Sequence, residues 1–428
     1  MKLLQSKSLH ILLSIALLLL PSLRCQSPSG SRSSVTFWSL GAEGEQVEKL
    51  IPEFERRNPG IRVRVQRIPW TAAHEKLLTA YAGESMPDLC QLGNTWIPEF
   101  VLLNAIEQID ARVDRSTVIK KESYFPGIWE TNIIGDGLFG IPWYVDTRVL
   151  FYRTDILAKM GFANAPRTWD ELLAVSRKIK ANLHGAEAYA ILLPSNEWAP
   201  QVVFGMQAGS SLLRDGDRYG AFSGKAFMTA LDFYVNFFQE DLAPTSLIRM
   251  RDVFQGFADG YFAMYITGPW NVGEFQRRLP EVVRSEWMTA PLPGFDGMTP
   301  GVSLAGGSSL VIFSSSTRKA EAWKLIEYLS EPEQQVTFYR LTGDLPARRE
   351  AWEDSSLSRN PYAQAFFSQL QHVQPMPRIP EWEQIAMKIQ QYSELASMGR
   401  MSVEKALAAL DEDVNVILEK RRWLLGRP

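Results

Sequence analysis

Val35-Thr-Phe-Trp-Ser-Leu40 is rich in β-branched and aromatic residues, and it predicts a strand. Apolar residues across 47–54 recur at i, i+3, i+4 and i+7, which is the pattern of one helix face. A strand at 61–65, in which apolar and charged residues alternate, and a helix at 73–81 come next, before the apolar run at 88–92. This alternation predicts an α/β fold built on a mostly parallel sheet.

Further helices and one further strand are predicted downstream of this alternation. The capping box Thr168-Trp-Asp-Glu171 is typical of the start of a helix. Ser308-Ser-Leu-Val-Ile-Phe313 predicts a strand. A helical tail is expected from about 319 to 422, with breaks near Gly343 and across 372–380.

Size and composition restrict the class of protein. A chain of 428 residues should form two or three compact units. The hydrophobic share of 46% and the charged share of 22% are ordinary for soluble globular proteins, so collagen-like, disordered and polytopic membrane classes are excluded. With 45 Lys and Arg against 48 Asp and Glu, the net charge is −3, which argues against a nucleic-acid partner.

The N-terminus has the three-part form of a secretory signal, which we assign to residues 1–25. Its apolar run is too short to span a bilayer. A Ser- and Gly-rich tether follows at 26–33. Cys25 at the end of the signal is a candidate for lipidation, although Arg24 stands where lipoproteins usually have a small residue, so a lipid anchor and cleavage to a free protein both stay open. In either case the protein is exported to the periplasm or the cell surface.

The sequence contains no motif whose surroundings fit a catalytic, metal or cofactor site. The letters GxGxxG at 135–140 precede a predicted turn and strand and do not open a helix, so they do not indicate a dinucleotide site. The four His are far apart in the sequence, so neither a metal site nor a catalytic triad is predicted. Cys90 is expected to be a small buried hydrophobic residue. We therefore predict no catalytic residue, no metal and no cofactor.

Three Trp residues share one local pattern. Trp70, Trp143 and Trp270 each follow a Pro directly at an apparent strand end. Proline fixes its own φ and keeps the preceding residue extended, so the indole is held on a stiff turn. The apolar face of a pyranose suits such a ring, and its hydroxyls suit nearby side chains such as those of Glu43 and Asp146. The pattern favours sugar binding, although any one of these Trp residues could instead fill a core.

Eight further runs carry a resemblance to a known family. They are Phe54-Glu-Arg-Arg-Asn-Pro-Gly60, Pro87-Asp-Leu-Cys-Gln-Leu-Gly-Asn-Thr-Trp96, Leu138-Phe-Gly-Ile-Pro-Trp-Tyr-Val-Asp-Thr-Arg-Val-Leu-Phe-Tyr152, Thr168-Trp-Asp-Glu-Leu172, Gly268-Pro-Trp270, Pro291-Leu-Pro-Gly294, Gly306-Gly-Ser308 and Leu345-Pro-Ala-Arg348. In order and spacing, over essentially all of 34–428, the chain resembles the family 1 extracellular solute-binding proteins of ABC sugar importers, of the maltose- and trehalose-binding kind.

The resemblance implies a two-lobed periplasmic-binding-protein fold of type II. Each lobe would be a mostly parallel sheet flanked by helices, with a hinge between the lobes. The first lobe would comprise 34–145 and 299–343, and the second 146–298 and 344–428. Chain crossings near 144–147, 291–295 and 342–345 would form the hinge.

The resemblance also implies a set of ligand-binding residues. They are Glu43, Trp70, Gln91, Asn94, Trp143, Tyr144, Asp146, Trp270, Gly306, Gly307 and Ser308. Gly93 and Ser308 depart from the residues that some disaccharide-binding relatives have there, so the sugar is not specified.

The expected function is that of an exported, non-enzymatic carbohydrate-binding protein that delivers a sugar to an ABC permease. Its expected partners are the sugar and the permease subunits, it should be a monomer, and it should touch a membrane only through a lipid anchor. One alternative is a secreted glycoside-acting enzyme that uses Glu43 and Asp146 as acid and base. Another is the same fold binding a non-sugar solute such as a polyol phosphate or a peptide.

Overall fold

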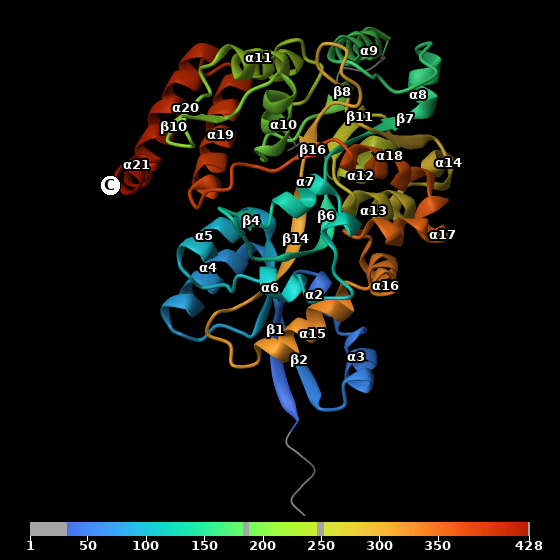
Figure 1. The fold of residues 1–428 in the computed structure, drawn as a ribbon. Helices are drawn as coiled ribbons and strands as arrows, with labels where there is room; N and C mark the ends of the chain where they lie inside the picture. The colour runs from blue at the N-terminus through green and yellow to red at the C-terminus, as the bar shows by residue number, and fades with distance from the viewer. Residues whose placement is uncertain (1–31, 183–187, 246–251, 427–428) are drawn as a thin grey trace, which may run out of the picture.

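The computed structural model describes residues 32–182, 188–245 and 252–426. The signal at 1–25 with Cys25, and residues 26–31 of the tether, lie outside the described residues. The first strand already begins at Ser33. Two β-sheets organise the molecule, one in its lower part and one in its upper part in Figure 1.

The first sheet has six strands in the order β15-β6-β14-β3-β1-β2. Their bounds are β1 Ser33–Leu40, β2 Ile61–Ile68, β3 Leu89–Gly93, β6 Ile141–Asp146, β14 Gly306–Ile312 and β15 Leu345–Pro346. β1 pairs in parallel with β2 and β3, as the strand and helix alternation predicted. β14, however, runs antiparallel to both β3 and β6.

The second sheet has four strands in the order β12-β7-β11-β8. Their bounds are β7 Val149–Arg153, β8 Tyr189–Leu192, β11 Phe262–Thr267 and β12 Trp287–Ala290. Only the β8 and β11 pair is parallel. The prediction of mostly parallel sheets is therefore wrong. β14 enters the first sheet between β3 and β6 after the chain has passed through the second sheet, and it runs antiparallel to both neighbours.

The described residues also form three short strand pairs. Two are antiparallel, β4 (Ile133–Ile134) with β5 (Gly137–Leu138) and β9 (Leu213–Arg214) with β10 (Tyr219–Gly220). The third is parallel, β13 (Ser303–Leu304) with β16 (Val373–Gln374). The GxGxxG letters at 135–140 fall on the β4 and β5 hairpin and lead into β6. This confirms that they do not open a helix, as a dinucleotide site would require.

Helices cover both sheets. Those in the part built on the first sheet are α2 (Glu43–Val47), α3 (Ile51–Arg57), α4 (Trp70–Ala82), α5 (Ile97–Leu102), α6 (Asp110–Val113), α7 (Pro126–Glu130), α15 (Lys319–Leu329) and α16 (Pro332–Thr342). Those in the part built on the second sheet are α8 (Thr154–Lys159), α9 (Trp169–Asn182), α10 (Ala199–Gln207), α11 (Lys225–Gln239), α12 (Val253–Ala258), α13 (Trp270–Arg278), α14 (Glu281–Arg284), α17 (Ser355–Ser358), α18 (Pro361–Leu370), α19 (Trp382–Ser397), α20 (Val403–Ile417) and α21 (Glu419–Leu425). Within the described ranges, none of these helices is both long and apolar enough to cross a bilayer.

The chain passes between the two sheets three times. It leaves the first sheet after β6, returns between β12 and β14, and leaves again after β15. The third passage follows Leu345–Pro346, slightly beyond the predicted boundary at 343, because this short strand still pairs with β6. Gly343 ends α16 with φ of 86°, a left-handed conformation that glycine adopts readily, as the predicted break required.

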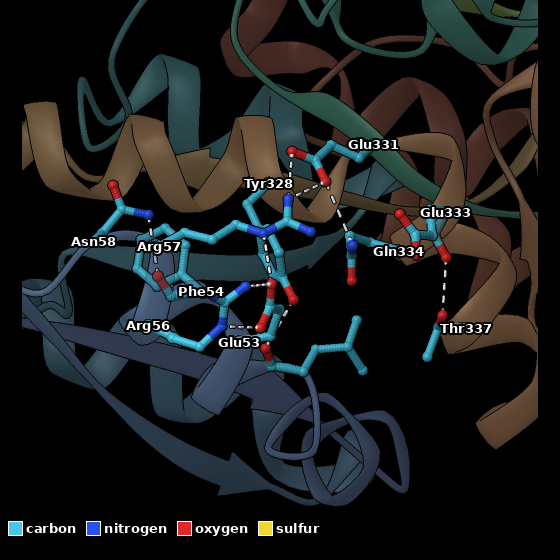
Figure 2. Close-up of polar contacts among 11 residues, drawn as sticks. Glu53, Phe54, Arg56, Arg57, Asn58, Tyr328, Glu331, Glu333, Gln334 and Thr337 are labelled. Atoms are coloured by element: carbon cyan, nitrogen blue, oxygen red, sulfur yellow. Dashed lines mark hydrogen bonds and ion pairs between the residues drawn. The ribbon is translucent and has the colours of Figure 1, made fainter.

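Figure 2 shows the polar contacts that join α3 to α16. Glu53 accepts a hydrogen bond from Arg57 at 2.7 Å, and Arg57 also donates to Glu331 at 2.9 Å. The Arg57 guanidinium lies 5.3 Å from the centre of the Tyr328 ring. Exposed ion pairs of this kind contribute little stability, about 0–1 kcal/mol each. They help to fix the position of α16, whose C-terminal end leads directly to Asp344 in the cavity described below.

Cys90 lies on β3 and is fully buried, which confirms its expected role as a small hydrophobic residue. Burial raises the pKa of its thiol, so the reactive thiolate is disfavoured.

Candidate functional site

A cavity of about 540 Å³ lies between the two sheets. In the first sheet, β1, β2 and β3 run in parallel, and the residues just after their carboxyl ends line the cavity. In the second sheet, the parallel strands β8 and β11 are followed by Trp198 and Trp270, which line it from the other side. The carboxyl ends of parallel strands are where α/β proteins bind ligands, because side chains on the following loops converge there. The cavity is therefore the candidate binding site.

Glu43 stands at the centre of a hydrogen-bond cluster on the first-sheet side. Its carboxylate accepts from Tyr144 Oη at 2.9 Å and from Trp70 Nε1 at 3.2 Å. The Tyr144 hydroxyl in turn accepts from Gln91 Nε2 and Ser308 Oγ, each at 3.0 Å. Burial, together with the nearby charge of Glu43, raises the pKa of Tyr144 well above its usual range, so this hydroxyl stays a donor.

Two glycines allow this cluster to close up. Gly41 has φ of 57°, and a Cβ there would lie 2.5 Å from Trp70 Cδ1 and 2.7 Å from a Glu43 oxygen. Gly307 has φ of 125°, and a Cβ there would lie 2.3 Å from the Tyr144 carbonyl oxygen. A side chain at either position would push the cluster apart.

Arg148 organises the opposite side of the cavity. Its guanidinium donates to both oxygens of Asp146, at 2.8 and 3.0 Å, and to Glu197 at 3.1 Å. It also lies 4.7 Å from the centre of the Trp270 ring, which is 43% exposed. Burial raises the pKa of Asp146, and the neighbouring Arg148 opposes that rise. The Trp270 indole thus lies against a partly buried ion-pair network while the ring itself stays accessible.

A third aromatic side chain, Trp96, extends the wall around Trp70. The two rings meet edge to face with centroids 5.7 Å apart, and His74 packs on Trp96 at 5.1 Å. His74 also hydrogen-bonds Glu99 at 2.6 Å, and this contact raises the pKa of the imidazole. The contacts with His74 and Trp70 fix the position of the Trp96 ring, which can serve as a rigid apolar surface.

Asp344, directly after the Gly343 that ends α16, brings a further carboxylate to the cavity. Its carboxylate makes no ion pair within the described part of the chain. Burial, with the negative charges of Glu43 and Asp146 added, raises its pKa to about 7, while a hydrogen bond with Thr342 acts in the opposite direction. Near neutral pH, a proton on Asp344 relieves part of the repulsion among these carboxylates.

The raised pKa of Asp344 predicts a specific pH dependence of stability. The native state binds this proton more tightly than the unfolded chain does, so the free energy of unfolding should fall as pH rises from about 4 to about 7. Asp344→Asn removes this loss, and the variant should exceed the parent at pH 8 by on the order of 2 kcal/mol and match it at pH 4. Urea unfolding without sugar measures both values. A difference that is the same at both pH values would contradict the assignment.

Most of the predicted site residues meet in this cavity. The lining includes Glu43, Trp70, Asn94, Tyr144, Asp146, Trp270, Gly306, Gly307 and Ser308. Their contact with a ligand stays a prediction. Asn94 is already engaged, since its Nδ2 donates to the Ala305 carbonyl at 3.0 Å.

Two predicted site residues do not line the cavity. Trp143 lies within β6 and is 1% exposed, stacked on Phe338 with centroids 4.3 Å apart. The prediction that it is a sugar platform is therefore wrong, because its side chain points into the core. Gln91 is also fully buried, and its Oε1 accepts from Ser39 Oγ and the Leu40 amide. It positions Tyr144 and does not reach the cavity.

Sequence reasoning missed several lining residues, among them Trp96, Trp198, Asp344 and Glu383. Trp96 lies in a run that carried the family resemblance, so its aromatic character was a usable signal. Asp344 follows Gly343 and resembles an ordinary turn residue, and Glu383 resembles a solvated helix position. Nothing local to these two carboxylates distinguishes them from surface residues.

The chemistry of the lining is that of a binding site for a polar molecule with apolar faces. Indole rings supply flat apolar surfaces, and carboxylates, a guanidinium and a hydroxyl supply hydrogen bonds. Across the described ranges, no three His, Cys, Asp or Glu side chains are grouped so that they could hold a metal ion.

The fold and this cavity define a solute-binding protein. A family model described as bacterial extracellular solute-binding protein matches residues 38–336, and the chain belongs to that family. Proteins of this family are transport components that bind a solute outside the cytoplasm and do not transform it, so the alternative of a glycoside-acting enzyme is set aside.

Particular relatives sharpen this assignment. The chain is similar to the sugar-binding protein MalE of Xanthomonas citri, with 47% identity, a TM-score of 0.89, and 92% of this chain and 100% of that chain covered. An ABC transporter solute-binding protein from Thermotoga lettingae, bound with α-D-tagatose, is 28% identical with a TM-score of 0.75 over 90% of this chain and all of its own. The diacetylchitobiose-binding protein DasA of Streptomyces coelicolor is 25% identical over 82% of this chain and 81% of its own.

Proposed function

We propose that this protein captures a sugar or oligosaccharide in the cavity between its two sheets and delivers it to the permease of an ABC importer. One observation carries the proposal most directly. Trp70, at the start of α4 on the first-sheet side, and Trp270, at the start of α13 on the second-sheet side, both line the cavity, together with the Glu43 carboxylate. Rigid indoles beside a hydrogen-bond acceptor match a pyranose, which has an apolar face and a rim of hydroxyls.

The relatives support the same ligand class. The Xanthomonas citri protein is described as sugar-binding, the Streptomyces coelicolor protein as diacetylchitobiose-binding, and the Thermotoga lettingae structure holds tagatose. At 47% identity over 92% of this chain, the first of these is the strongest support.

The proposal extends to export and assembly. The signal at 1–25 would direct the chain out of the cytoplasm, and Cys25 would carry a lipid that holds a monomer near its permease. The two lobes, one built on the first sheet and one on the second, would close over the sugar about the three chain crossings. Mass spectrometry of the protein from membranes tests the lipid on Cys25 directly.

A thermal-shift screen tests the function. Neutral monosaccharides, disaccharides and maltodextrins should include at least one compound that raises the melting temperature. A ligand that binds only the folded state stabilises it by about 2.7 kcal/mol at a hundredfold excess over Kd. A set in which no sugar raises the melting temperature, while a peptide or a polyol phosphate does, would overturn the proposal in favour of a non-sugar solute.

Trp270→Ala should weaken binding of the sugar found by this screen and leave the fold intact. The ring is 43% exposed, so its removal takes little apolar surface out of the core. Losing its contact with the sugar should cost about 1–3 kcal/mol, a factor of about 5 to 150 in Kd. Calorimetric titration measures the affinity.

Trp423→Ala is the matched control, since Trp423 on α21 is 57% exposed and does not line the cavity. It should bind sugar as the parent does. If Trp270→Ala also kept full affinity, Trp270 would not be a sugar platform.

A further inference from the structure

The charged residues that line the cavity are unbalanced in sign. Four of them are carboxylates, on Glu43, Asp146, Asp344 and Glu383, and one is a guanidinium, on Arg148. The chain as a whole is close to neutral, with a net charge of −3 over 428 residues, so this excess is local to the cavity.

The guanidinium of Arg148 already has carboxylate partners within the protein. Arg148 donates to both oxygens of Asp146 and, through its other terminal nitrogen, to Glu197. Its flat face is directed to the Trp270 ring, with 4.7 Å between the guanidinium carbon and the ring centre. Arg148 is therefore neutralised by two carboxylates and has little capacity to pair with an anionic ligand.

Two of the remaining carboxylates, on Glu43 and Asp344, make no ion pair within the described ranges, whereas the imidazole of His74 lies near Glu383 and attracts its charge when protonated. Glu43 accepts hydrogen bonds from Trp70 and Tyr144, which are neutral donors. Asp344 lies close enough to Glu43 and Asp146 for both to repel its charge. Glu43 lies on α2, Asp146 on β6 and Thr342 at the end of α16. These residues supply the groups that face the Asp344 carboxylate.

On this basis, and resting on the proposed function, we propose that the cavity selects its ligand by charge, with Asp344 as the specificity-determining residue. Neutral sugars and amino sugars are accepted, and sugar acids and sugar phosphates are rejected. A hydroxyl or an ammonium group donates hydrogen bonds to a carboxylate, whereas a bound phosphate or carboxylate would add a like charge without a free cation to meet it.

Pairs of sugars that differ in charge test this selection at pH 7.5. Suitable pairs are trehalose with trehalose 6-phosphate, maltose with maltobionic acid, and cellobiose with the deacetylated chitobiose that carries two amines. For each neutral sugar that binds, the anionic partner should bind at least about tenfold more weakly, and the amino partner at least as tightly. An anionic partner that binds as tightly as its neutral counterpart would overturn the inference.

The role of Asp344 is tested separately. In Asp344→Asn, the ratio of Kd for the anionic sugar to Kd for the neutral sugar should fall by about fivefold or more, because one repelling charge is gone. Glu333→Gln removes the same charge from the far end of α16, outside the cavity, and should leave the ratio as in the parent (Figure 2). An unchanged ratio in Asp344→Asn would overturn the role of Asp344.

A second measurement does not depend on any variant. In the parent protein, discrimination against maltobionic acid should narrow between pH 8 and pH 5.5 as Asp344 gains its proton, and a constant ratio would count against the proposal. Failure of every sugar, charged or neutral, is a different result. It would contradict the proposed function itself and not the selection by charge.

Discussion

Trp143→Ala is expected to lower the free energy of unfolding by about 3–5 kcal/mol, the usual cost of truncating a large aromatic side chain in a core. Trp143 is 1% exposed, stacks on Phe338 and meets Phe37 edge to face with centroids 6.0 Å apart. Removing the indole would leave a cavity between β6 and α16 that the surrounding backbone cannot fill. Urea unfolding in the absence of sugar measures this loss.

Trp143→Phe is the matched control. It keeps an aromatic ring on Phe338, and the indole Nε1 that it removes has no hydrogen-bond partner within the described part of the chain. The loss should therefore be less than half of that in Trp143→Ala. A Trp143→Ala variant with the stability of the parent but much weaker sugar binding would show that Trp143 is a platform after all.

Arg148→Met is expected to destabilise the protein by about 3 kcal/mol at pH 7, because it breaks an ion-pair network that is largely removed from water. The Arg148 side chain is 11% exposed, and its loss leaves Asp146 and Glu197 with unpaired charges. Because methionine keeps much of the side-chain volume, the loss of stability should reflect mainly the removal of the positive charge. It should be smaller at pH 5, since burial raises the pKa of Asp146 and this carboxylate then takes up a proton more readily.

The double variant Arg148→Met with Asp146→Asn separates charge from packing. If unpaired charge is the cause, removing the Asp146 charge should recover part of the lost stability. A double variant no more stable than Arg148→Met alone would contradict that cause and would point to lost packing of Arg148 on Trp270.

The sequence was sufficient to predict the elements whose pattern is local. The alternation from Val35 to 92 predicted β1, β2 and β3 with their parallel pairing, and Gly343 marked the end of α16. Sheet composition was not predictable in the same way. Which distant strand enters between β3 and β6 depends on contacts far apart in the chain, and β14 fills that place in an antiparallel direction.

The three Pro-Trp pairs show why the site was predicted only in part. Trp70, Trp143 and Trp270 have the same local signal, and two of them line the cavity. Trp143 differs because it lies inside a six-residue strand, with its side chain on the face that packs against Phe338. A proline restricts the backbone before an indole but does not determine which face of a sheet the indole occupies.

Charged residues show a similar limit. Asp146 was predicted as a ligand-binding carboxylate, and it lines the cavity, but both of its oxygens accept from Arg148 two residues away. Asp344 gave no sequence signal, although burial and the charges of Glu43 and Asp146 raise its pKa to about 7. Such differences arise from burial and from neighbours that the fold brings together, and neither is visible in local sequence.

A crystal structure of the protein with the sugar that gives the largest thermal shift tests whether the cavity is the sugar-binding site. We expect the sugar in the cavity between the two sheets, with its apolar face on Trp270 or Trp70 and its hydroxyls donating to Glu43 and Asp344. A sugar bound elsewhere on the protein, with this cavity empty, would show that the cavity is not the binding site.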